Sequence, residues 1–193
     1  RAAVALLKTA ERPIVVSGTG ALYAEAGAAL KEFVELSGVP FYTTPQGRGI
    51  VSDDHRLCLL GARSTAFREA DCVMVVGTRM NYVIGHAAPP RFAAGATIAR
   101  IDIDADEIAS SPRKVDIGIV GDCASVLADM LREWRSVTPE PDKGRLTEWL
   151  SKIRGWKARE CLGYWPSGTT IKPQYAVQRL YEATKGRETY VTT

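Results

Sequence analysis

Three short apolar runs between Ala70 and Asp122 constrain the fold most strongly. They read C-V-M-V-V-G, I-A-R-I-D-I-D and I-G-I-V-G-D, and each stops at a glycine or an aspartate. None has the period of an amphipathic helix, and such runs are typical of strands buried on both faces of a sheet. A polar turn and a segment that can be helical follow each run. Repeated strand–turn–helix units predict a parallel, doubly wound sheet.

Further apolar runs extend this pattern toward the N-terminus. Together they predict a mostly parallel, six-stranded, Rossmann-like α/β sheet with helices on both faces and a helical extension at the C-terminus. Strands are expected at residues 14–18, 40–43, 58–60, 72–76, 98–103 and 117–120. Helices are expected at residues 1–9, 24–37, 105–109, 124–135, 146–160 and 173–184, with one more beginning near Ser64.

Composition is that of a globular protein with a sizeable core. Apolar residues make up 46% of the chain and charged residues 24%. The net charge of +3 comes from interspersed signs, which does not favour a nucleic-acid partner. No apolar run approaches the roughly 20 residues of a membrane span. Because the four cysteines form no C-x-x-C pair and both histidines are isolated, we expect reduced thiols, no metal site and a cytoplasmic protein.

Composition also divides the chain into three parts. Residues 1–136 carry the strand–helix pattern, residues 137–172 contain a Pro-rich linker and one helix, and residues 173–193 look like the start of another domain. The chain opens inside a helical pattern and closes in a strand just begun, so we expect a piece of a longer polypeptide. A stripe of Trp149, Ile153 and Trp156 is expected to pack against a neighbouring domain.

Ligands of doubly wound sheets bind outside the carboxyl ends of the strands. Residues 77–81, 102–104 and 121–123 are therefore expected to line a common crevice. An arginine at position 79 either makes bidentate contact with a phosphate or forms a structural ion pair. Asp102 either accepts hydrogen bonds from ribose hydroxyls or caps the next helix, for which Asp104 is the better candidate. Asp122 has the same two possible roles, a contact with the ligand or a helix cap.

The turn Gly18-Thr19-Gly20 follows the first strand and opens towards a helix. Its backbone N–H groups could meet a phosphate, or the glycines serve only a tight turn. Tyr23 occupies the place of a third glycine, so the chain carries no pyridine-dinucleotide fingerprint.

The ordered turns between Arg12 and Asp122 resemble the central domain of thiamine-diphosphate-dependent enzymes. The group is that of acetohydroxyacid (acetolactate) synthase, oxalyl-CoA decarboxylase and 2-hydroxyacyl-CoA lyase. The matching pieces are P-I-V-V-S-G-T-G, T-T-P-Q-G-R-G, L-L-G-A-R, D-C-V-M-V-V-G-T-R, R-I-D-I-D-A-D-E-I and I-V-G-D. The tail from Ile171 resembles the start of the pyrophosphate-binding domain of these enzymes and is particularly close to acetohydroxyacid synthases.

The resemblance implies a nucleotide in the crevice. Acetohydroxyacid synthases hold FAD at positions matching Thr44, Pro45, Leu60, Gly61 and Arg63, the last of which is more often His. Their G-x-R-x-D-D-R segment reads G-T-R-M-N-Y-V here, which is closer to the CoA-linked enzymes that bind ADP or CoA. The residues expected to bind FAD or ADP are Gly18, Gly20, Thr44, Pro45, Leu60, Gly61, Arg63, Gly77, Arg79, Asn81, Asp102, Ile103 and Asp122.

The resemblance also implies that this chain has no catalytic residues of its own. The parent enzyme would bind thiamine diphosphate and magnesium through an N-terminal glutamate and a C-terminal G-D-G…N motif, and this sequence has neither. Its implied partners are the other domains of the parent chain and further copies in a homo-oligomer. The leading hypothesis is the central domain of an acetolactate synthase-like carboligase or decarboxylase. The alternatives are an oxalyl-CoA decarboxylase or 2-hydroxyacyl-CoA lyase, and a structural module without a nucleotide. A sirtuin-like deacylase is disfavoured because no zinc-binding cysteine set is present.

Overall fold

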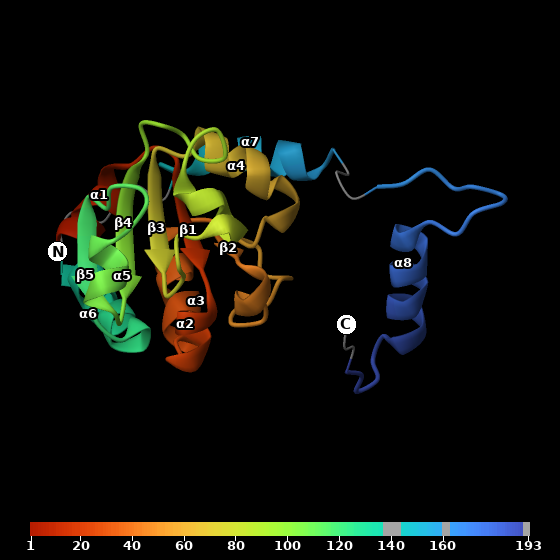
Figure 1. The fold of residues 1–193 in the computed structure, drawn as a ribbon, viewed down its shortest axis with the longest axis horizontal. Coiled ribbons are helices and arrows are strands. Elements are labelled where there is room, and N and C mark those ends of the chain that lie inside the picture. The colour runs from red at the N-terminus through yellow and green to blue at the C-terminus, as the bar shows by residue number, and fades with distance from the viewer. Residues whose placement is uncertain (137–143, 160–162, 191–193) are drawn as a thin grey trace.

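A five-stranded, all-parallel sheet forms the centre of the structure (Figure 1). The computed structural model describes residues 1–136, 144–159 and 163–190. The strand order is β2-β1-β3-β4-β5. The strands are β1 (Pro13–Ser17), β2 (Phe41–Thr43), β3 (Cys72–Val76), β4 (Thr97–Asp102) and β5 (Ile117–Val120). The predicted parallel α/β sheet with flanking helices is confirmed.

The prediction of a sixth strand at residues 58–60 is wrong. Leu57, Cys58 and Leu59 are buried like strand residues, but only a single parallel bridge joins Phe41 to Cys58. The chain turns immediately into the 3-10 helix η2 (Leu60–Ala62), which leaves no length for a ladder. In this case the apolar run indicates that the segment is buried, but not that it pairs as a strand.

Helices cover both faces of the sheet. One apolar cluster joins α1 (Ala2–Thr9), α3 (Gly27–Ser37) and α6 (Cys123–Ser136) to the first face. The cluster on the other face includes residues of α4 (Arg63–Glu69) and α7 (Thr147–Lys157). The remaining elements are α2 (Thr19–Tyr23), α5 (Ala105–Ala109), α8 (Pro173–Thr184) and the 3-10 helices η1 (Pro45–Gly47) and η3 (Tyr82–Ala87).

The helix predicted over residues 24–37 is α3, which begins at Gly27, and a separate helix that was not predicted precedes it. α2 already begins at Thr19, directly after the first strand, and α3 begins at Gly27. Between them Glu25 has φ +50°, which breaks the helical path. The predicted end is right, because Gly38 closes α3 in the left-handed conformation with φ +72°.

The aromatic stripe of α7 packs on this same domain, so the prediction of a neighbouring domain as its partner is wrong. Trp149 is 2% exposed and Ile153 is fully buried in the cluster shared with α4. The indole Nε1 of Trp149 donates a hydrogen bond of 3.0 Å to the carbonyl of Pro13 at the start of β1. α7 therefore covers part of the second apolar face of the sheet.

Replacing Trp149 by Phe should reduce the free energy of unfolding by about 1–2 kcal/mol, because the Pro13 carbonyl loses its partner and the smaller ring leaves space. Thermal unfolding measures this as a decrease in Tm of roughly 3–6 °C. Trp165, which is 89% exposed, provides the control. An unchanged Tm for Trp149→Phe, equal to that of Trp165→Phe, would show that α7 does not stabilise the domain.

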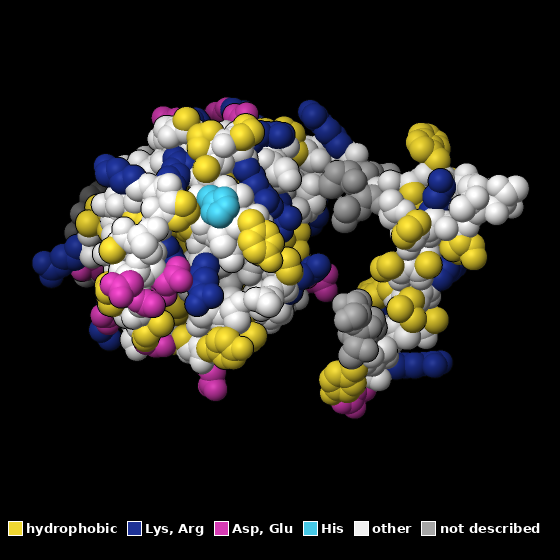
Figure 2. Space-filling view, viewed as in Figure 1, with side chains coloured by type: hydrophobic (Ala, Val, Ile, Leu, Met, Phe, Trp, Pro, Cys, Tyr) yellow, Lys and Arg dark blue, Asp and Glu magenta, His cyan; other side chains and the backbone are white. Residues whose placement is uncertain are grey.

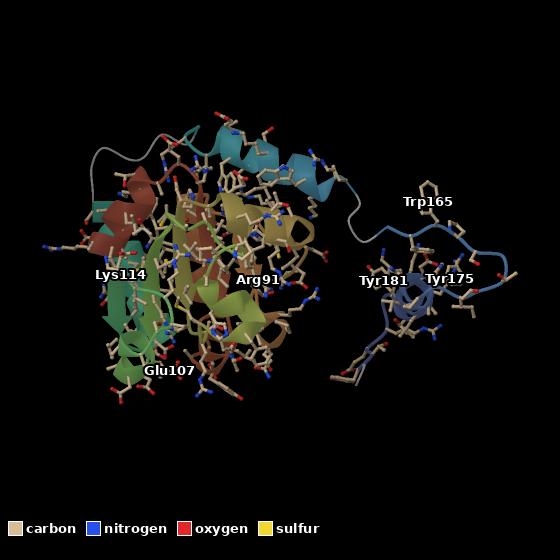
Figure 3. All side chains as sticks on the ribbon, turned by 45° about the horizontal axis from the view of Figure 1, so that its top comes forward. Arg91, Glu107, Lys114, Trp165, Tyr175 and Tyr181 are labelled. Atoms are coloured by element: carbon tan, nitrogen blue, oxygen red, sulfur yellow. The ribbon has the colours of Figure 1, made fainter. Side chains whose placement is uncertain are left out.

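The segment around α8 exposes its apolar side chains. None of the α8 residues is buried, and Trp165, Tyr175 and Tyr181 are exposed. Figure 3 shows these three rings projecting from the C-terminal segment, apart from the sheet. No helix among the described residues is long and apolar enough to cross a membrane.

The cysteines described by the structure are reduced thiols, as predicted. Cys58, Cys72 and Cys123 are buried and unpaired with one another. Burial raises the pKa of Cys58 to about 11, of Cys72 to about 12 and of Cys123 to about 11. Cys161 lies outside the described residues.

Candidate functional site

A pocket of about 780 Å³ opens at the carboxyl ends of the strands. It lies where the strand order reverses, because β1 is followed by β2 on one side and by β3 on the other. This reversal is the usual ligand site of doubly wound sheets. Most of the residues predicted from the sequence line the pocket, namely Gly20, Thr44, Pro45, Gly77, Arg79, Asn81, Asp102, Ile103 and Asp122.

Glycines allow the loops after β1 and β3 to touch. The N–H of Gly18 donates to the carbonyl of Val76 at 3.0 Å, and the N–H of Gly20 donates to the carbonyl of Gly77 at 2.7 Å. A Cβ on Gly20 would lie 2.9 Å from the Cα of Gly77. Both N–H groups are therefore engaged in joining the loops, and the tight-turn alternative accounts for these two glycines.

Four predicted residues do not line the pocket: Gly18, Leu60, Gly61 and Arg63. Gly18 packs beneath the pocket, where a Cβ would lie 2.3 Å from the Cβ of Thr78. Leu60 and Gly61 lie in η2, and Arg63 begins α4. The structure therefore places Leu60, Gly61 and Arg63 outside the pocket lining, whereas Gly18 supports the lining from below without reaching it.

Arg63 belongs to a group of arginines. Burial, together with the positive charges of Arg91 and Arg48, lowers the pKa of Arg63. On the face of the molecule seen in Figure 2, Lys and Arg side chains lie together beside a histidine. Guanidinium groups gathered in this way provide a local positive potential that favours anions.

Asp102 is held by Arg100 on the same strand. The Arg100 side chain is 1% exposed, and its Nη2 donates to Oδ2 of Asp102 at 2.7 Å and to Oε2 of Glu107 at 3.2 Å. Its Nη1 donates to Oγ of Ser111 at 2.6 Å. Within the part of the chain that the structure describes, Nε of Arg100 is buried and has no hydrogen-bond partner. The network fixes the carboxylate of Asp102 at the pocket edge.

Two aspartates cap helices. Oδ1 of Asp104 accepts from the N–H of Asp106 at 2.9 Å, which makes Asp104 the N-cap of α5 as predicted. Oδ1 of Asp122 accepts from the N–H of Ser125 at 2.9 Å at the start of α6. Hydrogen bonds from Ser125 lower the pKa of Asp122, so this carboxylate is ionised at neutral pH. Capping is established for both residues, and a ligand role for Asp122 stays a prediction.

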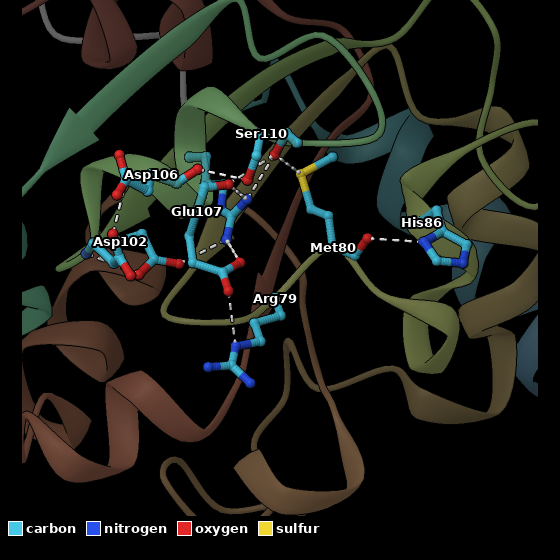
Figure 4. A network of polar contacts seen from close by, with 10 residues as sticks. Arg79, Met80, His86, Asp102, Asp106, Glu107 and Ser110 are labelled. Atoms are coloured by element: carbon cyan, nitrogen blue, oxygen red, sulfur yellow. Dashed lines mark hydrogen bonds and ion pairs between the residues drawn. The ribbon is translucent and has the colours of Figure 1, made fainter.

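Arg79 forms the ion pair that was one of its two predicted roles. Its Nε lies 3.0 Å from Oε1 of Glu107, and its side chain is 75% exposed (Figure 4). Asn81 starts η3, because its Oδ1 accepts from the N–H of Val83 at 3.0 Å. Both side chains line the pocket.

Sequence reasoning missed the residues that connect the loops. Thr19 donates through Oγ1 to Oε1 of Gln46 at 3.1 Å, which joins the loops after β1 and β2 across the pocket. It also missed Arg100 and Glu107. The signal for Arg100 was present, since a charged residue inside an apolar strand needs buried partners.

The arrangement is suited to holding a ligand. The pocket combines the cationic side chain of Arg79 with the carboxylates of Asp102 and Asp122. Cys123, the one thiol among the described residues that line it, has a raised pKa and is therefore a poor nucleophile. Among the described residues no group of His, Cys, Asp or Glu could hold a metal ion.

Comparisons with known proteins agree with this architecture. The sequence profile of the family described as thiamine pyrophosphate enzyme, central domain, matches residues 1–130. The chain is 36% identical over 159 residues to 2-hydroxyacyl-CoA lyase of Arabidopsis thaliana, covering 82% of this chain and 27% of that protein. It is 39% identical over 136 residues to oxalyl-CoA decarboxylase of Escherichia coli K12, covering 70% and 24%. It is 33% identical over 198 residues to acetolactate synthase isozyme 3 large subunit of the same organism, covering 99% and 34%.

The chain spans about a quarter to a third of the length of these curated relatives. The profile match covers all five strands of the sheet and the loops that form the pocket. The chain therefore belongs to the thiamine pyrophosphate enzymes, and its parallel sheet is their central domain.

Proposed function

We propose that this domain binds an adenine nucleotide with a diphosphate in the pocket at the strand ends. Its parent would be a thiamine-diphosphate-dependent lyase or decarboxylase that acts on a CoA thioester. The observation that carries the proposal is the convergence of Arg79 and Asp102 on one pocket at the switch point of the sheet. Its volume of about 780 Å³ is of the size that small-molecule ligands occupy.

The chemistry of the lining suits the two ends of such a ligand. The carboxylate of Asp102 stands at the end of β4, where doubly wound domains commonly accept hydrogen bonds from ribose hydroxyls. Arg79 follows β3 on the other side of the switch point and offers a guanidinium to phosphate oxygens. Asn81 and Val83 stand where the FAD-binding pattern has charged residues, which favours ADP or CoA over FAD. The names of the relatives with 36% and 39% identity also indicate CoA thioesters.

Thiamine chemistry is assigned to the rest of the parent. The family implies thiamine diphosphate and magnesium, but the described residues provide no cluster that could hold a metal ion. This domain would contribute scaffolding and nucleotide binding. The other domains and a homo-oligomer would complete the active site.

Thermal unfolding of the 193-residue chain with ADP, FAD or adenosine tests the proposal. ADP at about one hundred times its Kd should stabilise the fold by roughly 2.7 kcal/mol, which raises Tm by about 5–10 °C. FAD should stabilise it less. If none of the three ligands changes Tm, the nucleotide role is wrong and the structural-module hypothesis stands.

Arg79→Ala should weaken ADP binding about tenfold, because it removes a charge-assisted contact of roughly 1.4 kcal/mol. Isothermal titration calorimetry measures the effect. Arg132→Ala is the matched control, since Arg132 is also 75% exposed and paired with a carboxylate, but lies on α6 outside the pocket. Equal ADP affinities for both variants would remove Arg79 from the site.

An acetolactate synthase-like parent is the second candidate. One observation favours it: the similarity to the acetolactate synthase subunit extends over 99% of the chain, including the tail. A flavin spectrum in the purified parent protein would support this candidate. A colourless parent that is stabilised by ADP would support the CoA-linked one.

A further inference from the structure

We propose that Glu107 makes the pocket selective for ligand charge, by occupying Arg79 until an anionic group replaces it. The inference rests on the proposed binding of an adenine nucleotide. It assigns to Glu107 a role in specificity and no role in catalysis.

Glu107 is shared between two arginines. Its Oε1 lies 3.0 Å from Nε of Arg79, and its Oε2 lies 3.2 Å from Nη2 of Arg100. Figure 4 shows Arg79 in contact with Glu107. The carboxylate therefore occupies Nε of Arg79, one of the donors on that guanidinium that a phosphate could also use.

The two arginines differ in how firmly they are held. Arg100 is 1% exposed and keeps Asp102 and Ser111 as partners, whereas the Arg79 side chain is 75% exposed. When a ligand anion takes Arg79, Glu107 retains its contact with Arg100. No buried charge loses its counter-charge, so the exchange avoids the large penalty of an unpaired ion.

This arrangement treats neutral and anionic ligands differently. A diphosphate that uses Nε of Arg79 replaces the carboxylate contact there, and in any pose on this guanidinium it approaches the negative charge of Glu107, which reduces its net gain from Arg79. Adenosine has no phosphate that Arg79 could contact, so its affinity should not depend on Glu107. Removing the charge of Glu107 should therefore strengthen the binding of ADP alone.

Titration calorimetry on Glu107→Gln tests the inference, with ADP and adenosine as separate ligands. An exposed ion pair contributes up to about 1 kcal/mol, so we expect ADP to bind about fivefold more tightly. The affinity for adenosine should stay within about twofold. Glu133→Gln is the matched control: the Glu133 side chain is 24% exposed and paired with an exposed arginine, close to the 31% of Glu107, but lies on α6 outside the pocket.

A double-mutant cycle separates this role from a structural one. In an Arg79→Ala background, Glu107→Gln should no longer improve ADP binding. If Glu107→Gln does not fold, Glu107→Ala provides the same test, because it also removes the carboxylate from Arg79. Tighter ADP binding is expected there too.

The outcomes distinguish the two proposals. If the unmodified chain binds ADP but Glu107→Gln binds it no more tightly, the inference about Glu107 is overturned and the nucleotide site remains. An equal gain for adenosine would also overturn it. If the unmodified chain binds neither ligand, the proposed function fails and the inference fails with it.

Discussion

Gly77→Ala is expected to reduce the free energy of unfolding by about 3 kcal/mol, of which left-handed backbone strain contributes roughly 1–2 kcal/mol and steric overlap the rest. Gly77 has φ +57°, and a Cβ there would lie 2.5 Å from the amide nitrogen of Ala21. It would also lie 2.9 Å from Sγ of Cys123. The contacts with Ala21 involve backbone that cannot rotate away, so the loops after β1 and β3 must separate.

Chemical denaturation measures this loss, and thermal unfolding should show Tm lower by about 6–12 °C. Gly49→Ala separates the two causes, because Gly49 has φ +86° but a Cβ added there would meet no neighbouring atom within 4 Å. It should retain only the strain. If Gly77→Ala is no more destabilising than Gly49→Ala, the close packing of the two loops is not required for the fold.

The strand positions could be predicted from the sequence, because a strand that is buried on both faces is a nearly continuous apolar run. The run that became β3 is apolar throughout until Gly77 follows it, and within β4 Arg100 is the one charged residue before Asp102 at the carboxyl end. The turn after each strand then carries the pocket residues, because all strands point the same way. The same apolar pattern misled the prediction at Cys58 and Leu59, since a buried segment of any conformation is apolar. Whether such a segment pairs as a strand depends on how many residues remain before the chain turns, and the local sequence pattern does not give that number.

Partners of individual side chains were harder to predict. Asp104 as a helix cap followed from local spacing alone, because its acceptor and the N–H of Asp106 are two residues apart. The pair between Arg79 and Glu107 depends on how the loop after β3 meets α5. Trp149 likewise depends on a tertiary contact, because its indole reaches Pro13 across the chain. Local patterns identified the candidate residues, and only packing determined what each one contacts.

Arg100→Leu should reduce the free energy of unfolding by about 3 kcal/mol, since breaking a buried ion pair leaves an uncompensated charge. The side chain of Asp102 is only 12% exposed, and its Oδ2 would lose its 2.7 Å partner. We expect Tm to fall by about 6–12 °C in thermal unfolding at neutral pH. The loss should have two parts, the space that the guanidinium leaves and the carboxylate that remains without its partner.

A second substitution distinguishes these parts. Without Arg100, the carboxylate of Asp102 stays largely buried and loses its counter-charge, which disfavours the folded state. Adding Asp102→Asn removes that charge and should recover part of the loss at neutral pH. If Asp102→Asn does not reduce the deficit of Arg100→Leu, Arg100 stabilises β4 by packing alone, because the charge of Asp102 would then have no measurable need of a partner.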